Sequence, residues 1–266
     1  MMAMRLAGNV RHFLLLLVCG TLLMAACPTA SAQVAPLAPR WLAGTPPPPV
    51  ETFADGLARH HIELTEAALI AALTDPDGEV RSLAAAQLAA MDDHPALPAI
   101  LRALLAERDP QVEVNLAGAA TWLGSGRALD QLQQLCQDVN VPSTARLDAA
   151  RYVSNKELPT CFPAIEQIER TEADPSIRVL AVVAAAGYRG QRERAQALAA
   201  SALADLDPTV RIAAADALRF LRATNAVAAL DRALRIEGDD TAREHLREAV
   251  RVLRLPSADA DNDEAQ

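Results

Sequence analysis

The sequence is poor in aromatic residues: Phe, Trp and Tyr make up 3% of it, although 51% of its residues are hydrophobic. The hydrophobic content therefore comes mainly from Ala and Leu, which are strong helix formers. This balance predicts an all-α protein whose layers are thin and closely packed.

Long basic segments are also missing, and the few basic side chains are nearly all Arg. The formal net charge is −9, so the chain offers no extended positive surface to a phosphate backbone. We therefore expect no nucleic-acid partner.

The motifs that carry catalysis are missing as well. No Gly-rich phosphate loop is present, and Gly124-Ser125-Gly126 is interpreted as a turn, because Ser125 has no recognisable triad partners. A metal site needs ligands that converge, whereas the histidines beyond the N-terminal segment are scattered along the chain. They are His60, His61, His94 and His245. We expect no catalytic residue, no metal, no cofactor and no small-molecule substrate.

Cysteine is scarce, and only Cys136 and Cys161 lie beyond residue 32. An oxidising compartment would permit a disulfide between them. The repeat register described below places them near opposite ends of neighbouring helices, too far apart for a bridge. We therefore expect two buried free thiols; the alternative, a disulfide, requires the Pro-rich connection Pro159–Pro163 to break the register.

The N-terminus has the composition of a bacterial export signal. Two arginines precede an apolar core from Phe13 to about Ala26, which is too short for a comfortable membrane span. Ala30-Ser31-Ala32 is a small-x-small cleavage site. We expect cleavage after Ala32 and a periplasmic or secreted protein.

A second interpretation of this segment is a lipoprotein signal. Met24-Ala25-Ala26-Cys27 resembles a lipoprotein cleavage box, which would leave a lipidated Cys27. Met is not the favoured residue at the first position of such a box, so cleavage after Ala32 is preferred. Contact with a membrane is expected only if Cys27 is lipidated.

Four segments are predicted along the chain. Residues 1–32 are the signal peptide, and residues 33–62 are a Pro-rich linker with a short helix over Glu51–His60. A repeat domain occupies residues 63–254. Residues 255–266 form a small, acidic tail that is expected to be disordered.

The repeat domain is built from one recurring unit. In its clearest copy, Asp207–Leu218, Asp207 is an N-cap and Pro208 takes the first helical position. Val210, Ala214 and Leu218 then lie on one face of the helix. The residue three after the cap recurs every 32 or 33 positions, as Val80, Val112, Ala145, Ile177, Val210 and Ala242.

Each of these helices follows another amphipathic stretch, so the unit is a helical hairpin with the capping Asp at its turn. One hairpin cannot bury its apolar faces alone, but stacked copies can. The pattern Asp-Pro-x-Val-Arg-x-x-Ala-Ala-x-x-Leu resembles the short HEAT-like repeats of bacterial proteins, including those of phycobilisome lyases. This resemblance implies an α-solenoid of about six hairpins, with the second helix of each lining the concave side.

The last copy departs from the others. Arg247, which is followed by Glu248, occupies a position that is Ala or Val in inner copies. We expect this hairpin to be an end cap whose free face meets water.

An Arg stands four residues after the cap Asp in most copies. Such Asp and Arg residues can bond within and between units, and we call them the Asp–Arg ladder. Its predicted members are Asp77, Arg81, Asp174, Arg178, Asp207, Arg211, Asp239 and Arg243. We expect the ladder to be structural.

Specificity is expected where the copies differ. Aromatic and Arg side chains are enriched at binding hot spots, and a few occur late in the second helices. The predicted protein-binding residues are Trp122, Arg151, Tyr152, Arg219, Phe220 and Arg251. Because the chain is acidic, a basic or mixed-charge protein partner is expected.

The sequence thus favours a non-catalytic, protein-binding scaffold or adaptor of the bacterial periplasm or envelope. One alternative is a subunit of a metal- or chromophore-handling enzyme, because some HEAT-repeat proteins are di-iron hydroxylases or chromophore lyases. The His-Glu pairs of the hydroxylases are missing from this chain. Another alternative is a structural envelope protein that is lipid-anchored through Cys27.

Overall fold

The computed structural model describes residues 52–255. The predicted signal peptide, the cleavage site after Ala32, Cys27 and nearly all of the acidic tail lie outside these residues. Within them, the regular elements are thirteen α-helices, α2 to α14, and three short 3-10 helices. This confirms the predicted all-α solenoid. In the same range, no helix combines the length and the apolar character that a membrane crossing requires.

The chain divides into two compact units, one up to Ala96 and one from Leu97 onward. The described elements of the first unit are α2 (Phe53–Arg59), α3 (Glu66–Ala72), α4 (Gly78–Ala90) and η2 (His94–Ala96). The short helix predicted ahead of the repeats is present as α2, which packs on α4. Arg59 of α2 is ion-paired with Glu79 of α4 at 3.2 Å.

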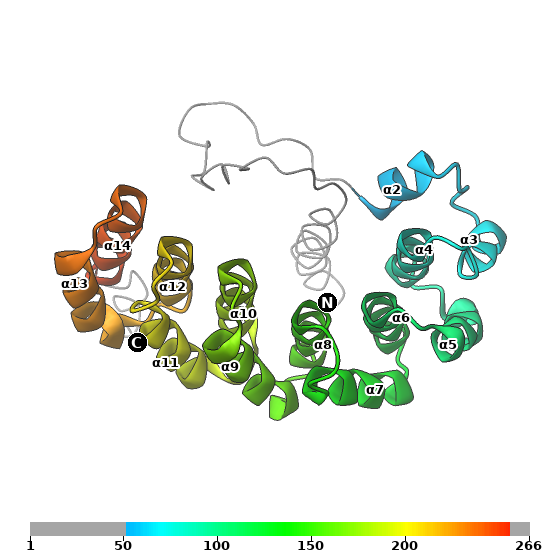
Figure 1. The fold of residues 1–266 in the computed structure, drawn as a ribbon. Helices are drawn as coiled ribbons and strands as arrows, with labels where there is room; N and C mark the ends of the chain where they lie inside the picture. Colours follow the sequence, from blue (N-terminus) through cyan, green and yellow to red (C-terminus); the bar gives the residue numbers. More distant parts are fainter. Residues whose placement is uncertain (1–51, 256–266) are drawn as a thin grey trace, which may run out of the picture. The chain divides into compact units, whose positions relative to one another are not determined.

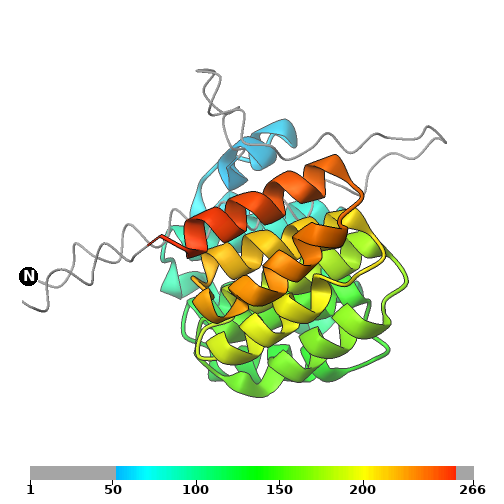
Figure 2. The same ribbon diagram turned by 90° about the vertical axis from the view of Figure 1, so that its left-hand side faces the viewer.

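The second unit consists of five stacked hairpins. They are α5 (Leu97–Ala106) with α6 (Pro110–Trp122), α7 (Gly126–Gln137) with α8 (Ser143–Ser154), α9 (Phe162–Thr171) with α10 (Pro175–Gly187), α11 (Arg192–Ala202) with α12 (Pro208–Phe220), and α13 (Val227–Ile236) with α14 (Asp240–Leu253). Within this unit α6, α8, α10, α12 and α14 lie along the inner side, and α7, α9, α11 and α13 lie along the outer side (Figure 1). Figure 2 shows α14 along its length, at one end of the stack.

The predicted caps are confirmed. In each of five hairpins the cap Asp side chain accepts a 2.8 Å hydrogen bond from a backbone N–H in the first turn. These caps are Asp77, Asp109, Asp174, Asp207 and Asp239. Pro142 is the exception, without a side-chain cap bond. Because the caps fix where each helix starts, the same register position faces the core in every copy.

The last hairpin is a polar end cap, as predicted. On α14 the side chains of Leu246 and Ala249 are fully buried against the stack. Glu244 and Arg247 on the same helix are exposed. The helix therefore closes the apolar core on one side and presents charged groups on the other.

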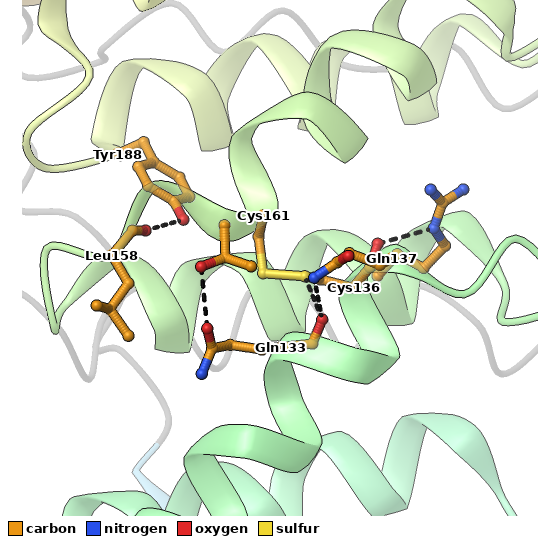
Figure 3. The surroundings of a disulfide bond; sticks show 8 residues. Gln133, Cys136, Gln137, Leu158, Cys161 and Tyr188 are labelled. Carbon is orange, nitrogen blue, oxygen red and sulfur yellow. Dashed lines mark hydrogen bonds between the residues drawn. A yellow bond between two sulfur atoms is a disulfide. The ribbon is translucent and has the colours of Figure 1, made fainter.

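The two thiols predicted to be free are instead joined, so that prediction is wrong. Cys136 and Cys161 form a disulfide with their Cα atoms 5.7 Å apart (Figure 3). Both side chains are completely buried. The alternative, in which the Pro-rich connection changes the register, is the one observed.

The physical reason lies in the connection ahead of α9. Pro159–Cys161 forms the 3-10 helix η3, which packs on α7 and α8 before the chain enters α9. Along the outer side, the end of α7 lies next to the start of this η3–α9 segment (Figure 1). Thr160 Oγ1 donates to Gln133 Oε1 of α7 at 2.9 Å, and this hydrogen bond holds the two segments together beside the disulfide.

One residue of left-handed conformation occurs in every return turn between hairpins. The φ angles are +57° at Asp92, +93° at Gly124, +59° at Glu157, +72° at Gly190 and +48° at Arg222. Glycine adopts this conformation readily, whereas an L side chain costs about 1–2 kcal/mol there. The turns at Glu157 and Arg222 therefore carry strain that the turns at Gly124 and Gly190 avoid.

Replacing Glu157 by glycine is expected to raise the free energy of unfolding by about 0.5–1 kcal/mol. The gain is the relieved strain less the greater chain entropy of glycine in the unfolded state. Urea unfolding followed by circular dichroism measures the change. As the control, Gly190→Ala should lower stability by about 1 kcal/mol, because the added Cβ would meet no atom closer than 3.8 Å and only the backbone is strained. A loss of stability in Glu157→Gly would contradict the strain.

Candidate functional site

The candidate site is the inner face of the second unit. We define it by the side chains that α6, α8, α10, α12 and α14 present away from the outer helices. These helices pack in succession, α6 on α8, α8 on α10, α10 on α12 and α12 on α14. The exposed or half-buried residues of these helices that we consider for this face are Trp122, Arg151, Tyr152, Leu180, Val183, Asp216, Arg219, Phe220, His245, Glu248 and Arg251.

The two predicted aromatic anchors are both exposed but are not brought together. Trp122 is the last residue of α6 and is 44% exposed, and Phe220 is the last residue of α12 and is 72% exposed. Two helices, α8 and α10, lie between them. A partner that touches both would have to span those helices.

Tyr152 serves mainly to pack α8 against α6. A Cβ atom added at Gly118 of α6 would lie 2.2 Å from the Tyr152 ring, so the ring fills the space that glycine leaves. Burial raises the pKa of the Tyr152 phenol well above its ordinary range. This residue therefore contributes to the interface between two helices more than to a contact surface.

The three predicted arginines are all ion-paired with an acid one helical turn earlier. The pairs are Arg151–Asp148 at 2.5 Å, Arg219–Asp216 at 3.3 Å and Arg251–Glu248 at 2.6 Å. Asp216 also lies 3.0 Å from Nδ1 of His245, which connects α12 to α14. The inner face therefore carries alternating charges, not a basic patch.

Two exposed apolar residues of this face were not singled out from the sequence. Leu180 and Val183 lie one turn apart on α10, the central inner helix, and are 45% and 46% exposed. The corresponding position of Leu180 in α8 is Asp148, and that of Val183 is Arg151. Comparing the copies position by position, instead of searching for aromatic residues, would have revealed them.

The Asp–Arg ladder exists, but with other acids. Arg178 donates from Nε and Nη2 to the Asp205 carboxylate at 2.8 and 2.9 Å. Arg211 donates in the same way to Glu237, with both distances 2.6 Å. The predicted pairing with the cap Asp of the same helix is wrong for these two arginines. Among the last three hairpins the ladder instead joins each hairpin to the next.

The reason is that both partners are engaged elsewhere. The cap carboxylates accept from backbone N–H groups of the first helical turn. The Nη1 groups of Arg178 and Arg211 donate to carbonyl oxygens of the turn before their own helix. Arg81 Nη1 and Arg243 Nη2 make the same kind of contact, to Asp75 O and Glu237 O at 2.7 Å each. Each Arg therefore fastens the turn of its own hairpin.

The ladder changes the acidity of its carboxylates. The guanidinium of Arg178 lowers the pKa of Asp205, and that of Arg211 lowers the pKa of Glu237. The Glu237 side chain is 2% exposed and that of Arg211 is 17% exposed. Screening by water is therefore weak at this pair, unlike at the surface pair Arg251–Glu248, whose side chains are 61% and 40% exposed.

Glu237→Gln is expected to lower the free energy of unfolding by about 2 kcal/mol, because the buried guanidinium loses its charged partner. Glu248→Gln breaks a pair of the same bidentate geometry at the surface and should cost at most about 0.5 kcal/mol. Urea unfolding at neutral pH measures both. Equal losses in the two variants would contradict the role assigned to burial.

Lowering the pH should also weaken the ion pair between Glu237 and Arg211. The pKa of Glu237 is lower in the folded protein than its unfolded value of roughly 4.3. Its contribution is therefore complete above that value and is lost as the pH falls through the folded pKa. Glu237→Gln should accordingly lose less stability than the unaltered protein between pH 7 and about pH 3.

Metal chemistry receives no geometric support from the described part of the chain. Among residues 52–255, no three His, Cys, Asp or Glu side chains converge in a way that could hold an ion. The charged groups of the inner face instead meet each other in pairs.

Comparisons with known proteins agree with the repeat assignment. Residues 66–153, which contain the three hairpins from α3 to α8, match the family model of HEAT repeats. Among solved structures, the crystal structure of an engineered protein is 21% identical, covering 70% of this chain and 94% of its own, with a TM-score of 0.41. No curated protein matches the chain.

Proposed function

We propose that this protein is a non-catalytic scaffold or adaptor that binds another protein through the inner face of its second unit. HEAT-like repeats provide a helical scaffold suited to protein interaction. The observation that carries the proposal is the exposed pair Leu180 and Val183 at the centre of this face. Exposed apolar groups with a polar rim mark interaction sites.

The rim indicates what such a partner carries. On either side of α10 stand the ion pairs Arg151–Asp148 and Arg219–Asp216. A partner with an apolar centre and charges of both signs around it would complement this arrangement. For this face we therefore favour the mixed-charge partner over the purely basic one.

We also propose that the protein is exported. The N-terminal segment has the features of a signal peptide cleaved after Ala32. The Cys136–Cys161 disulfide supports this location, because disulfides persist in oxidising compartments. Mass spectrometry of the protein from its native host would show a mature chain beginning at Gln33, whereas a lipidated chain beginning at Cys27 would favour a membrane anchor.

Affinity capture from envelope extracts tests the inner face. The unaltered protein should retain a partner, and Leu180→Ser/Val183→Ser should lose most of it. Met91→Ser is the matched control, since Met91 is 46% exposed, as Val183 is, but lies in the first unit. All variants should unfold at similar urea concentrations. Retention by the double variant, or no partner at all, would overturn the proposal.

A further inference from the structure

The most exposed apolar side chain of the described residues stands at a hairpin tip, not on the inner face. Leu206, in the turn between α11 and α12, is 96% exposed. Ile236, before the next such turn, is 86% exposed, and Val139, in the turn between α7 and α8, is 66% exposed. Ala173, in the turn between α9 and α10, is also exposed. We call Val139, Ala173, Leu206 and Ile236 the tip ridge.

The four turns of the tip ridge are bonded to one another in succession. Ser143 donates to Glu172 at 2.6 Å, which joins the α7–α8 turn to the α9–α10 turn. Arg178 bonds the Ala173 carbonyl and the Asp205 carboxylate, so it joins the next two turns. The tips therefore form a continuous strip along one edge of the unit.

A single guanidinium links the two most exposed members. Arg211 donates from Nη1 to the Leu206 carbonyl at 3.0 Å and from Nε and Nη2 to the carboxylate of Glu237, which directly follows Ile236. Leu206 and Ile236 thus flank one arginine on adjacent turns. A partner segment that contacts Leu206 can reach Ile236 as well.

The Leu206 turn is held rigidly. The Asp207 N–H donates to Asp205 at 2.8 Å, and Asp205 itself is gripped by both Nε and Nη2 of Arg178. Because the backbone on both sides of Leu206 is already ordered, a partner pays little conformational entropy to meet this side chain.

The folding role of the turn does not explain Leu206. The acids on either side of it cap α12 and bind the ladder arginine, but the Leu side chain contacts water almost entirely. Turns ordinarily favour Gly, Pro, Asn, Asp and Ser. Apolar side chains on consecutive pinned turns are therefore better explained by a partner than by folding.

Charge indicates which partner fits. The tip turns carry the acids Asp138, Glu172, Asp174, Asp205, Asp207, Glu237, Asp239 and Asp240. Fewer cations lie in or beside these turns, namely Arg146, Arg178, Arg211 and Arg243 at the ladder position and Arg170 and Arg235 in the last turns of α9 and α13. An excess of carboxylates surrounds the apolar tips, so basic groups are attracted and acidic ones repelled.

We propose that the tip ridge is a second protein-binding surface, separate from the inner face, and that it takes a basic segment with apolar contact residues. Its apolar tips would anchor the aliphatic side chains of that segment, and the excess negative charge around them would attract its Lys or Arg. A second copy of this chain fits poorly, because it carries a net charge of −9 and the same acidic ridge. An anionic membrane surface is repelled for the same reason.

Two synthetic peptides of equal length test the ridge, one alternating Leu with Lys and one alternating Leu with Glu. Calorimetric titration of the purified protein at physiological salt should show binding of the Lys peptide only. Leu206→Ser/Ile236→Ser should weaken that binding by about tenfold, since two apolar anchors are removed. Leu64→Ser/Met91→Ser in the first unit is the matched control, since both side chains are 46% exposed and belong to neither proposed surface, and it should leave the binding within about twofold.

Three results would overturn the proposal. One is no binding of the Lys peptide, and another is equal binding by the unaltered protein and the Leu206→Ser/Ile236→Ser variant, which would show attraction by charge alone. The third is binding to phosphatidylserine vesicles that depends on Leu206, which would identify a membrane surface. None of these results bears on partner capture through Leu180 and Val183, so the two proposals fail separately.

Discussion

Reduction of the Cys136–Cys161 disulfide is expected to lower the free energy of unfolding by about 3–4 kcal/mol. The two cysteines are 25 residues apart in the chain, and releasing that loop increases the entropy of the unfolded state. The expected loss is a large share of the total free energy of unfolding, which is roughly 5–15 kcal/mol for most domains.

Urea unfolding with and without dithiothreitol measures the effect, and thiol titration confirms reduction. The control is Cys136→Ala/Cys161→Ala, whose unfolding should not respond to the reductant. Both cysteines are buried, so the double variant should be less stable than the oxidised protein in either condition. An unchanged midpoint with both thiols demonstrably free would contradict the stabilising role.

Gly118→Ala is expected to destabilise the protein by about 2–3 kcal/mol, although alanine is the better helix former. The new methyl group would lie 2.2–2.5 Å from the Tyr152 ring atoms, so α6 and α8 would have to separate or the ring would have to leave its place. Either change opens the packing between two central helices of the unit.

The sign of this effect should reverse when the ring is removed. In a Tyr152→Ala background, Gly118→Ala should stabilise by up to about 1 kcal/mol through helix propensity alone. The double-mutant cycle would then show a coupling of about 3 kcal/mol. Gly126→Ala, whose added Cβ meets nothing within 4 Å, should not destabilise. Additive effects of the Gly118 and Tyr152 changes would disprove the contact.

The regular part of the fold was predictable because it depends on local chemistry. An N-cap Asp needs only the N–H groups of its own first turn, so Asp77, Asp109 and Asp207 could be assigned from the sequence. The apolar residue three after each cap then fixed the register of the stack. Neither inference required knowledge of any contact between hairpins.

Contacts between hairpins were harder to predict. The pairing of Arg178 with Asp205 joins residues 27 apart, and the nearby cap Asp207 was as good a candidate by distance along the chain. The cap carboxylates do not pair with these arginines because they already accept hydrogen bonds from backbone N–H groups. The disulfide was missed because the two cysteines were placed by the repeat register alone, and the 3-10 turn η3 of three residues leaves little periodicity to detect.

The candidate site was predictable only in part. Trp122 and Phe220 were selected because aromatic residues are rare in this chain, and both are exposed. Tyr152 was selected by the same criterion, but its ring packs on Gly118. The prediction failed because nothing in the sequence marked that glycine as the space that the ring fills. Leu180 and Val183 were overlooked because aliphatic residues are abundant and usually buried.

The disulfide also matters for how the stack would respond to a pulling force. In a repeat protein each hairpin contacts only its neighbours, so an array stretched from its ends can come apart one hairpin at a time. Cys136 and Cys161 join the end of α7 to the start of α9 and enclose α8. The 25 residues between them would withhold roughly 85 Å of extension at about 3.4 Å per residue. Under tension the segments before Cys136 and after Cys161 would therefore extend, whereas the loop between the two cysteines would stay closed as long as the disulfide is intact.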